Sequence, residues 1–121
     1  MSNETQLRED ICRFGRSLFE RGLTPGSSGN ISVKMHDGGW LVTPTNASLG
    51  FLDPARLSRL DGRGRLLSGD APTKEVPLHT ALYDTRESAR AIVHLHSTHS
   101  VALSMLPEID PRAALPPMTA Y

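Results

Sequence analysis

Cysteine is almost absent from this 121-residue sequence, in which Cys12 is the only one. A lone thiol excludes an intrachain disulfide and any zinc or redox motif built from several cysteines. Long hydrophobic runs are missing too, since no stretch approaches the ~20 apolar residues of a membrane span. Residues 1–4 lack the basic start and apolar run of a signal peptide. We therefore expect a cytoplasmic protein with no membrane partner.

A surplus of positive charge is also lacking, because 13 Lys and Arg residues balance 13 Asp and Glu residues. This balance argues against a nucleic-acid partner, whose phosphate backbone is bound by clustered cations. Aromatic residues make up only 5% of the chain, but its hydrophobic share of 38% exceeds that of disordered proteins. We therefore expect a folded protein, and the length allows one domain over residues 1–121.

Apolar residues near the N-terminus recur at steps of three and four, which places them on one stripe of an amphipathic helix. They are Leu7, Ile11, Phe14 and Leu18. Asn3 followed by Gln6 resembles a capping box, and Gly22 suits the left-handed position after the last turn. These signals predict a helix over residues 4–21.

Glycines and hydroxyl side chains dominate residues 24–30. Such a segment is either an ordinary connecting loop or one whose backbone a ligand can approach closely. Alternating apolar residues then predict a hairpin with strands at 31–35 and 40–43. Further patterns predict, in chain order, a short helix opened by Asp53-Pro54, a second hairpin around Gly62-Arg63-Gly64, a helix over 75–85, a strand over 91–95 and a helix that starts at Ser97 or Thr98 and ends at Leu106.

Two histidines stand at the end of the strand predicted at 91–95. His94 and His96 are two residues apart, so their side chains point to the same face and both imidazoles can reach one metal ion. Zinc accepts imidazole ligands, and it keeps a position open for substrate when the protein supplies only three ligands. The alternative is that the two histidines are simply buried and hydrogen-bonded.

Glu75 opens the helix predicted at 75–85. Free backbone N–H groups and the positive end of the helix dipole favour anions at such a position. Together with His94 and His96, Glu75 would form a site for an anionic substrate. The alternative is that Glu75 only complements the dipole of its own helix.

The other histidines are less suited to a site formed by Glu75, His94 and His96. His79 lies on the apolar face of the helix at 75–85, and we expect it to pack in the core or to support the site from behind. His36 falls in a hairpin turn and His99 in the helix that follows the strand, so we expect both to be bystanders.

Four short segments occur in an order and spacing that match a known family. They are Gly29-Asn30, Val42-Thr43-Pro44, Pro72-Thr73-Lys74-Glu75 and Val93-His94-Leu95-His96. With the initial helix and the hairpin, they resemble the class II aldolase/adducin family. Within that family, segments 39–45 and 72–79 are most similar to those of bacterial decarboxylases that act on 3-oxo-tetronate 4-phosphates.

The resemblance implies an α/β fold, a three-layer α-β-α domain around a mostly antiparallel sheet, assembled as a homotetramer with active sites between subunits. It also implies one zinc ion held by His94 and His96, with Glu75 as an acid-base residue that can also touch the metal when substrate is absent. The residues that it implies for binding the phosphate of an acid-sugar substrate are Asn30, Thr43, Thr73 and Lys74.

The chain departs from the family at two points. Family aldolases often carry two serines where this chain has Thr73-Lys74, and a cation there could hold either the phosphate or the carboxylate that is lost. The third metal histidine of the family lies in a later part for which this chain has no counterpart. Since residues 107–121 also resemble an extended, proline-rich connector, we expect a domain truncated at its C-terminus, with an exposed sheet edge.

Decarboxylation is the activity that the resemblance implies, with a 3-oxo-tetronate 4-phosphate giving carbon dioxide and dihydroxyacetone phosphate. Zinc would stabilise the negative charge that develops on the ketone oxygen, and Glu75 would handle the proton. A fuculose phosphate-like aldolase would use the same groups, whereas a non-catalytic adducin-like module would need none. Both alternatives stay open, although the joint presence of Glu75, His94 and His96 argues against the second.

Overall fold

The computed structural model describes residues 3–118. Its α-helices are α1 (Glu4–Glu20), α2 (Val76–Thr85) and α3 (Thr98–Ser104). Its strands are β1 (Asn30–Lys34), β2 (Trp40–Val42), β3 (Ser58–Leu60), β4 (Leu66–Ser68) and β5 (Ala91–His94). Two short 3-10 helices are η1 (Leu49–Phe51) and η2 (Pro54–Arg56). The last three residues of the connector predicted at 107–121 lie outside the described residues.

The strands form one sheet in the order β4-β3-β2-β1-β5, and every pair of neighbours is antiparallel. Both predicted hairpins are confirmed, since β1 pairs with β2 and β3 pairs with β4. β5 comes from farther along the chain and pairs with the free side of β1. Within residues 3–118, β5 therefore forms one edge of the sheet, and its Val93 side chain is 53% exposed.

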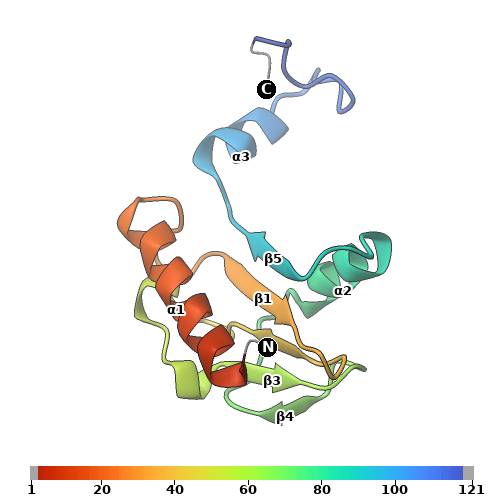
Figure 1. Ribbon diagram of the computed structural model, residues 1–121. Coiled ribbons are helices and arrows are strands. Elements are labelled where there is room, and N and C mark those ends of the chain that lie inside the picture. Colours follow the sequence, from red (N-terminus) through yellow and green to blue (C-terminus); the bar gives the residue numbers. More distant parts are fainter. Residues whose placement is uncertain (1–2, 119–121) are drawn as a thin grey trace.

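Helices cover the two faces of this sheet (Figure 1). Successive strand residues point to opposite faces, so Leu41 and Val42, both fully buried, belong to different cores. The core on the α1 side consists of Ile11, Ile31, Leu41, Leu49 and Leu57. The core on the α2 side consists of Trp40, Val42, Leu60 and Tyr83. The predicted three-layer α-β-α arrangement around an antiparallel sheet is thus confirmed.

α1 has the predicted extent to within one residue, but its N-terminus is capped differently. The Asn3 side chain accepts a hydrogen bond from the amide of Thr5 at 3.1 Å. Gln6 does not return a bond to Asn3 as a capping box requires, because it donates instead to Asp10 at 3.2 Å. At the other end, Gly22 has the expected left-handed backbone, with φ +72°.

The buried stripe of α1 also differs from the prediction at one position. Phe14 is 56% exposed, whereas Ile11 and Gly15 are buried. A Cβ atom at Gly15 would lie only 2.8 Å from the carbonyl oxygen of Leu49. The helix therefore packs closely against η1 through a residue without a side chain, and this close approach turns Phe14 toward solvent.

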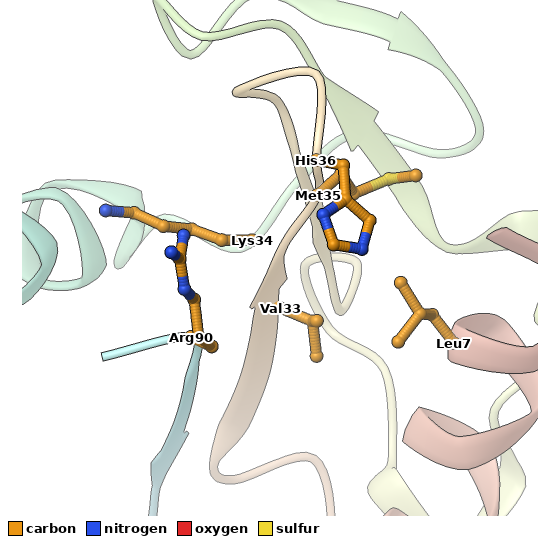
Figure 2. A pocket seen from close by; sticks show the side chains of 6 residues that line it. All are labelled: Leu7, Val33, Lys34, Met35, His36 and Arg90. Atoms are coloured by element: carbon orange, nitrogen blue, oxygen red, sulfur yellow. The ribbon is translucent and has the colours of Figure 1, made fainter. Parts of the chain in front are cut away.

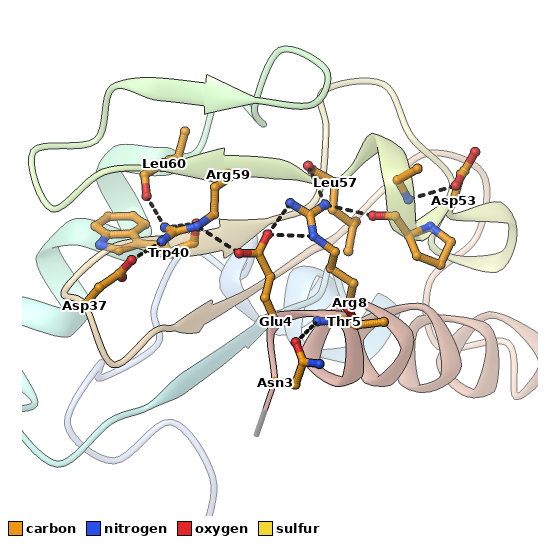
Figure 3. Close-up of polar contacts among 12 residues, drawn as sticks. Asn3, Glu4, Thr5, Arg8, Asp37, Trp40, Asp53, Leu57, Arg59 and Leu60 are labelled. Atoms are coloured by element: carbon orange, nitrogen blue, oxygen red, sulfur yellow. Dashed lines mark hydrogen bonds and ion pairs between the residues drawn. The ribbon is translucent and has the colours of Figure 1, made fainter. Parts of the chain in front are cut away.

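Charged side chains attach the start of α1 to β3 and to the turn between β1 and β2 (Figure 3). Arg59 on β3 is only 8% exposed, and it pairs with Asp37 in the β1–β2 turn and with Glu4 at 3.6 Å. Glu4 also pairs with Arg8 at 2.6 Å, whose guanidinium donates to the carbonyl oxygen of Leu57 at 3.2 Å. Because removing one partner would leave a buried charge unpaired, these contacts fix the helix relative to the sheet.

α3 follows β5 and lies beyond the end of that strand, away from α1 and α2 (Figure 1). It confirms the last predicted helix but ends two residues before Leu106. Across residues 3–118, every helix falls short of the length and apolar character that crossing a bilayer requires.

Candidate active site

Three elements bring their polar ends together beside the start of β1. β1 begins at Asn30, β5 ends at His94, and these two residues lie opposite each other in the antiparallel ladder. Glu75 reaches the same place as the N-cap residue of α2. The fold therefore places groups that are up to 64 residues apart in the sequence next to one another.

Glu75, His94 and His96 form one cluster, as predicted for the metal ligands. Each offers a ligand atom, and these atoms all lie within 4.8 Å of one another. Glu75 Oε2 is 2.9 Å from His94 Nδ1, and Glu75 Oε1 is 3.9 Å from His96 Nε2. His96 lies beyond the last strand residue, yet the two imidazole centroids are only 4.9 Å apart. Two imidazoles and a carboxylate are donors that zinc accepts, so these residues fit a zinc ion.

The carboxylate of Glu75 is stabilised in its ionised form. The side-chain amide of Asn30 donates a hydrogen bond to Oε2, and this bond is the main cause that lowers the pKa of Glu75 below its ordinary value. Partial burial opposes the shift, while the neighbouring His94 adds to it. An ionised carboxylate can both bind a metal ion and accept a proton.

Asn30 is itself held by buried partners. Its side-chain oxygen faces Nε2 of His79 and lies 3.2 Å from Nδ1 of His94. His79 is fully buried, and its other ring nitrogen lies 2.6 Å from Oγ of Ser32. Burial lowers the pKa of His79 to about 4, so the ring is neutral at neutral pH. His79 therefore both packs in the core and supports the site, which combines the two roles expected for it.

An open hollow of about 230 Å³ lies against the cluster. Side chains at its wall include Ser28, Asn30, Thr45, Thr73, Lys74, Glu75 and His96. Lys74 is exposed there and brings a positive charge next to the cluster. Four of the predicted site residues, namely Asn30, Thr73, Lys74 and Glu75, thus share one hollow with His96.

Thr43 differs from the other residues predicted to bind substrate. It is only 1% exposed, and its hydroxyl oxygen accepts a hydrogen bond from the amide of Ile31 at 3.1 Å. The hollow is lined instead by Thr45, two residues farther on. Thr43 therefore stabilises the start of strand β1 and is not brought to the wall of the hollow.

The prediction of free backbone N–H groups at the start of α2 is wrong. The amide of Glu75 donates to the Thr73 hydroxyl at 3.3 Å, and the amide of Val76 donates to the Thr73 carbonyl at 3.4 Å. The next residue, Pro77, has no N–H. The first amides of this helix are therefore not free to bind an anion in the hollow.

The loop at 24–29 approaches the end of β5 because Gly29 has no side chain. Gly29 has φ +77°, and a Cβ atom there would lie 2.8 Å from Thr24 Oγ1 and 3.0 Å from the carbonyl oxygen of His94. The preceding residue, Ser28, lines the hollow. Gly29 lines the hollow as well, so the segment contributes to its wall, and the close approach of a ligand to its backbone stays a prediction.

Two lining residues were missed by the sequence reasoning. Thr45 and Asn46 follow the end of β2 and contribute to the hollow. Asn46 has a left-handed backbone, with φ +57°, which asparagine tolerates better than most residues. The only signal in the sequence was a polar turn directly after the predicted strand at 40–43.

A second hollow lies at the opposite end of β1 (Figure 2). Its wall consists of Leu7, Val33, Lys34, Met35, His36 and Arg90. Apolar and cationic groups line it, and none of the predicted site residues does. His36 therefore lies away from the cluster, and His99 is exposed on α3, which agrees with the expectation that both are bystanders.

Comparisons with known proteins identify one family and relatives with two activities. Residues 9–121 match the family described as Class II Aldolase and Adducin N-terminal domain. The chain is 51% identical over 121 residues, its whole length, to a 3-oxo-tetronate 4-phosphate decarboxylase of Cupriavidus necator, of which it covers 55%. It is 34% identical over 104 residues, 86% of its length, to an L-fuculose phosphate aldolase of Haemophilus influenzae, of which it covers 48%.

A solved structure shows the same fold. The crystal structure of YgbL from Klebsiella pneumoniae matches with a TM-score of 0.86 and 48% identity, over 92% of this chain and 54% of that one. The present chain thus spans about half the length of the curated relatives that it matches.

Proposed function

This chain belongs to the family of class II aldolase and adducin N-terminal domains, and from this premise we propose that it catalyses a zinc-dependent decarboxylation. The substrate is a 3-oxo-tetronate 4-phosphate, and the products are dihydroxyacetone phosphate and carbon dioxide. The observation that carries the proposal is the convergence of Glu75, His94 and His96 beside one polar hollow. The 51% identity to a decarboxylase with this substrate in its name supports it.

Glu75, His94 and His96 are the residues that would hold the zinc ion. Their donor atoms lie close enough together, and Glu75 would contact the metal only while substrate is absent, which leaves positions for substrate atoms during the reaction. When bound, zinc supplies a Lewis acid that stabilises negative charge on the ketone oxygen of a 3-oxo acid.

Glu75 would also handle the proton that the reaction needs. When the bond between the carboxyl carbon and its neighbour breaks, carbon dioxide leaves and the bonding electrons pass toward the ketone. The neighbouring carbon must then take up one proton to give dihydroxyacetone phosphate. Oε2 of Glu75 accepts the Asn30 hydrogen bond, while Oε1 lies 3.9 Å from His96, beyond hydrogen-bond distance. Oε1 is therefore the oxygen suited to carry a proton.

Lys74, Thr73 and Asn30 would bind the anionic ends of the substrate. A 3-oxo-tetronate 4-phosphate carries a carboxylate and a phosphate, and Lys74 supplies a positive charge at the hollow. The amides of Glu75 and Val76 are occupied, which increases the importance of this lysine. Thr43, the fourth residue predicted for this role, would act indirectly by supporting β1.

A sugar-phosphate aldolase is the second candidate, because the chain is 34% identical to an L-fuculose phosphate aldolase. Incubating the zinc-loaded protein separately with a 3-oxo-tetronate 4-phosphate and with fuculose 1-phosphate distinguishes the two. Release of carbon dioxide from the first substrate supports the decarboxylase. Release of an aldehyde from the second alone contradicts it, and turnover of neither favours a non-catalytic adducin-like module.

We also propose that residues 1–121 form one class II aldolase/adducin-like domain that assembles as a homotetramer in the cytoplasm. Large exposed apolar side chains support an assembled state, since Phe51 is 78% and Val93 is 53% exposed. Light scattering tests this assembly: a mass of four chains is expected, and a stable monomer contradicts it.

A further inference from the structure

A line of buried polar side chains connects α2, through β1, to the candidate active site. His79 and Tyr83 lie one turn apart on α2, and Asn30 and Ser32 lie on one face of β1 because they are two residues apart. None of the four is more than 4% exposed. We refer to Tyr83, Ser32, His79 and Asn30 as the buried network.

Hydrogen bonds join the members of the buried network end to end. The hydroxyl of Tyr83 lies 2.8 Å from Oγ of Ser32, which lies 2.6 Å from Nδ1 of His79. Nε2 of His79 bonds to the side-chain oxygen of Asn30. The side-chain nitrogen of Asn30 donates to Glu75, where the network ends.

The carboxylate at the end decides the direction of each hydrogen bond. An ionised carboxylate only accepts, so Asn30 must turn its NH2 group to Glu75 and its oxygen to His79. That oxygen also only accepts, so the proton of the His79 ring must be on Nε2. Nδ1 of the neutral ring then accepts from the Ser32 hydroxyl, and the oxygen of Ser32 accepts from Tyr83. Every donor therefore points toward Glu75.

We propose that His79 is a positioning residue, which holds the Asn30 amide in the one orientation that donates a hydrogen bond to Glu75. This role deepens the proposed function and rests on it for the part that Glu75 plays. Without the Nε2–H group of His79, the Asn30 amide could turn over and present its oxygen to the carboxylate. Ser32 and Tyr83 act on Asn30 only through His79, because they hold the His79 ring in the tautomer that donates from Nε2.

The surroundings argue against a role in packing alone. Tyr83 belongs to a core formed with Trp40, Val42 and Leu60, so the buried network runs beside apolar side chains. An apolar residue at position 79 would fill this space without the cost of burying an imidazole. Instead, each polar atom that connects the network has a partner, and the last partner is the proposed acid-base residue.

The first test uses the metal-free protein, so it depends on neither zinc binding nor turnover. Nitrogen-15 NMR of the imidazole rings reports which nitrogen of His79 carries the proton. A proton on Nε2, with Nδ1 unprotonated, is expected. A proton on Nδ1 would overturn the proposal, because Nε2 could then no longer donate to Asn30. This measurement needs no variant and is unaffected by the folding of any mutant.

Variants then test whether His79 controls Asn30. His79→Leu removes both ring nitrogens, whereas His79→Gln keeps an N–H donor near the position of Nε2. The NMR signal of the Asn30 side-chain NH2 group should shift in His79→Leu and return toward its wild-type position in His79→Gln. An unchanged signal in a folded His79→Leu protein would overturn the proposal.

Ser58→Ala is the matched control. Ser58 is also fully buried, and its hydroxyl donates a hydrogen bond to the carbonyl oxygen of Asp70 at 2.7 Å. Its replacement removes a part-buried hydrogen bond of β3 but no hydrogen bond of the buried network. The Asn30 signal should therefore stay in place, and an equal shift in Ser58→Ala would mean that any loss of core stability moves it, which contradicts a specific role for His79.

Zinc affinity gives a second readout. Partners that orient metal ligands typically contribute about 10- to 100-fold to affinity, and we expect a loss of this size in His79→Leu, with partial recovery in His79→Gln. Equal affinities of folded His79→Leu and wild-type protein would contradict the proposal. A wild-type protein without zinc affinity would instead count against the proposed function, and the tautomer of His79 would still decide the positioning role.

Discussion

Asn30 lies directly opposite His94 in the pairing of β1 with β5, and the Asn30 side-chain oxygen is 3.2 Å from Nδ1 of His94. The ladder therefore fixes the distance between the residue that orients Glu75 and a predicted metal ligand. A shift of one residue in this register would turn His94 to the other face of the sheet. The candidate site thus depends on the same strand pairing that forms the sheet.

Replacing Glu75 with Gln should slow turnover much more than it weakens zinc binding. Glutamine keeps the size of the side chain but cannot accept and deliver the proton, so we expect kcat to fall by about 100- to 10,000-fold. Carbon dioxide release and zinc titration measure the two effects. Glu87→Gln is the control, since Glu87 is an exposed carboxylate outside the cluster. Wild-type turnover in Glu75→Gln would refute the assignment.

His94→Ala should remove the bound metal, because it deletes one of only two imidazoles in the cluster. Elemental analysis of the purified variant measures this loss. His99→Ala serves for comparison, since His99 is exposed on α3 and outside the cluster, and its zinc content should equal that of the wild type. Full zinc occupancy in His94→Ala would show that His94 is not a ligand.

Lys74→Met should raise KM for the phosphorylated substrate. A hydrogen bond to a charged group contributes about 1.5–3 kcal/mol, which corresponds to roughly a 10- to 100-fold change in affinity. Steady-state kinetics measures KM and kcat separately. Arg63→Met, in the exposed β3–β4 turn, removes a positive charge elsewhere and should leave KM unchanged. An unaltered KM in Lys74→Met would mean that Lys74 does not contact the substrate.

The buried His79 should make the protein less stable as the pH falls below 6.5. Burial lowers the pKa of His79 from 6.5 to about 4, so between these values the unfolded chain binds a proton that the folded protein does not. Stability should therefore fall by about 1.4 kcal/mol for each pH unit in this window, and the contribution of His79 is fully present above it.

Urea denaturation at pH 7, 6 and 5 measures this effect. In His79→Leu the part of the slope that comes from His79 should be absent. The prediction fails when the two proteins lose stability equally over these pH values.

Local sequence patterns were sufficient for most of the fold. Asp37-Gly38-Gly39 lies between two alternating strands, and turn chemistry and periodicity agree there, so the first hairpin was predictable. The exposure of Phe14 was not predictable, because the close contact of Gly15 with Leu49 depends on how η1 lies against α1. Such a contact between distant segments leaves no periodic signal.

Some features of the candidate site were likewise predictable from the sequence, and others were not. The convergence of Glu75, His94 and His96 was predictable, because the spacing of the two histidines and a family resemblance that includes Glu75 already indicated it. The burial of Thr43 and the occupied amides at the start of α2 depend on how β2 and segment 72–75 meet, which the sequence alone does not show. Nor could the sequence show that His79 bonds to Asn30, 49 residues away.

The zinc content of the wild-type protein, purified without added metal, tests the central claim most directly. Glu75, His94 and His96 are proposed to form one metal site, so elemental analysis should find about one zinc ion per chain, and a chelator should remove it. A folded protein that contains no zinc and takes up none on titration would contradict the proposed site and, with it, the zinc-dependent decarboxylation.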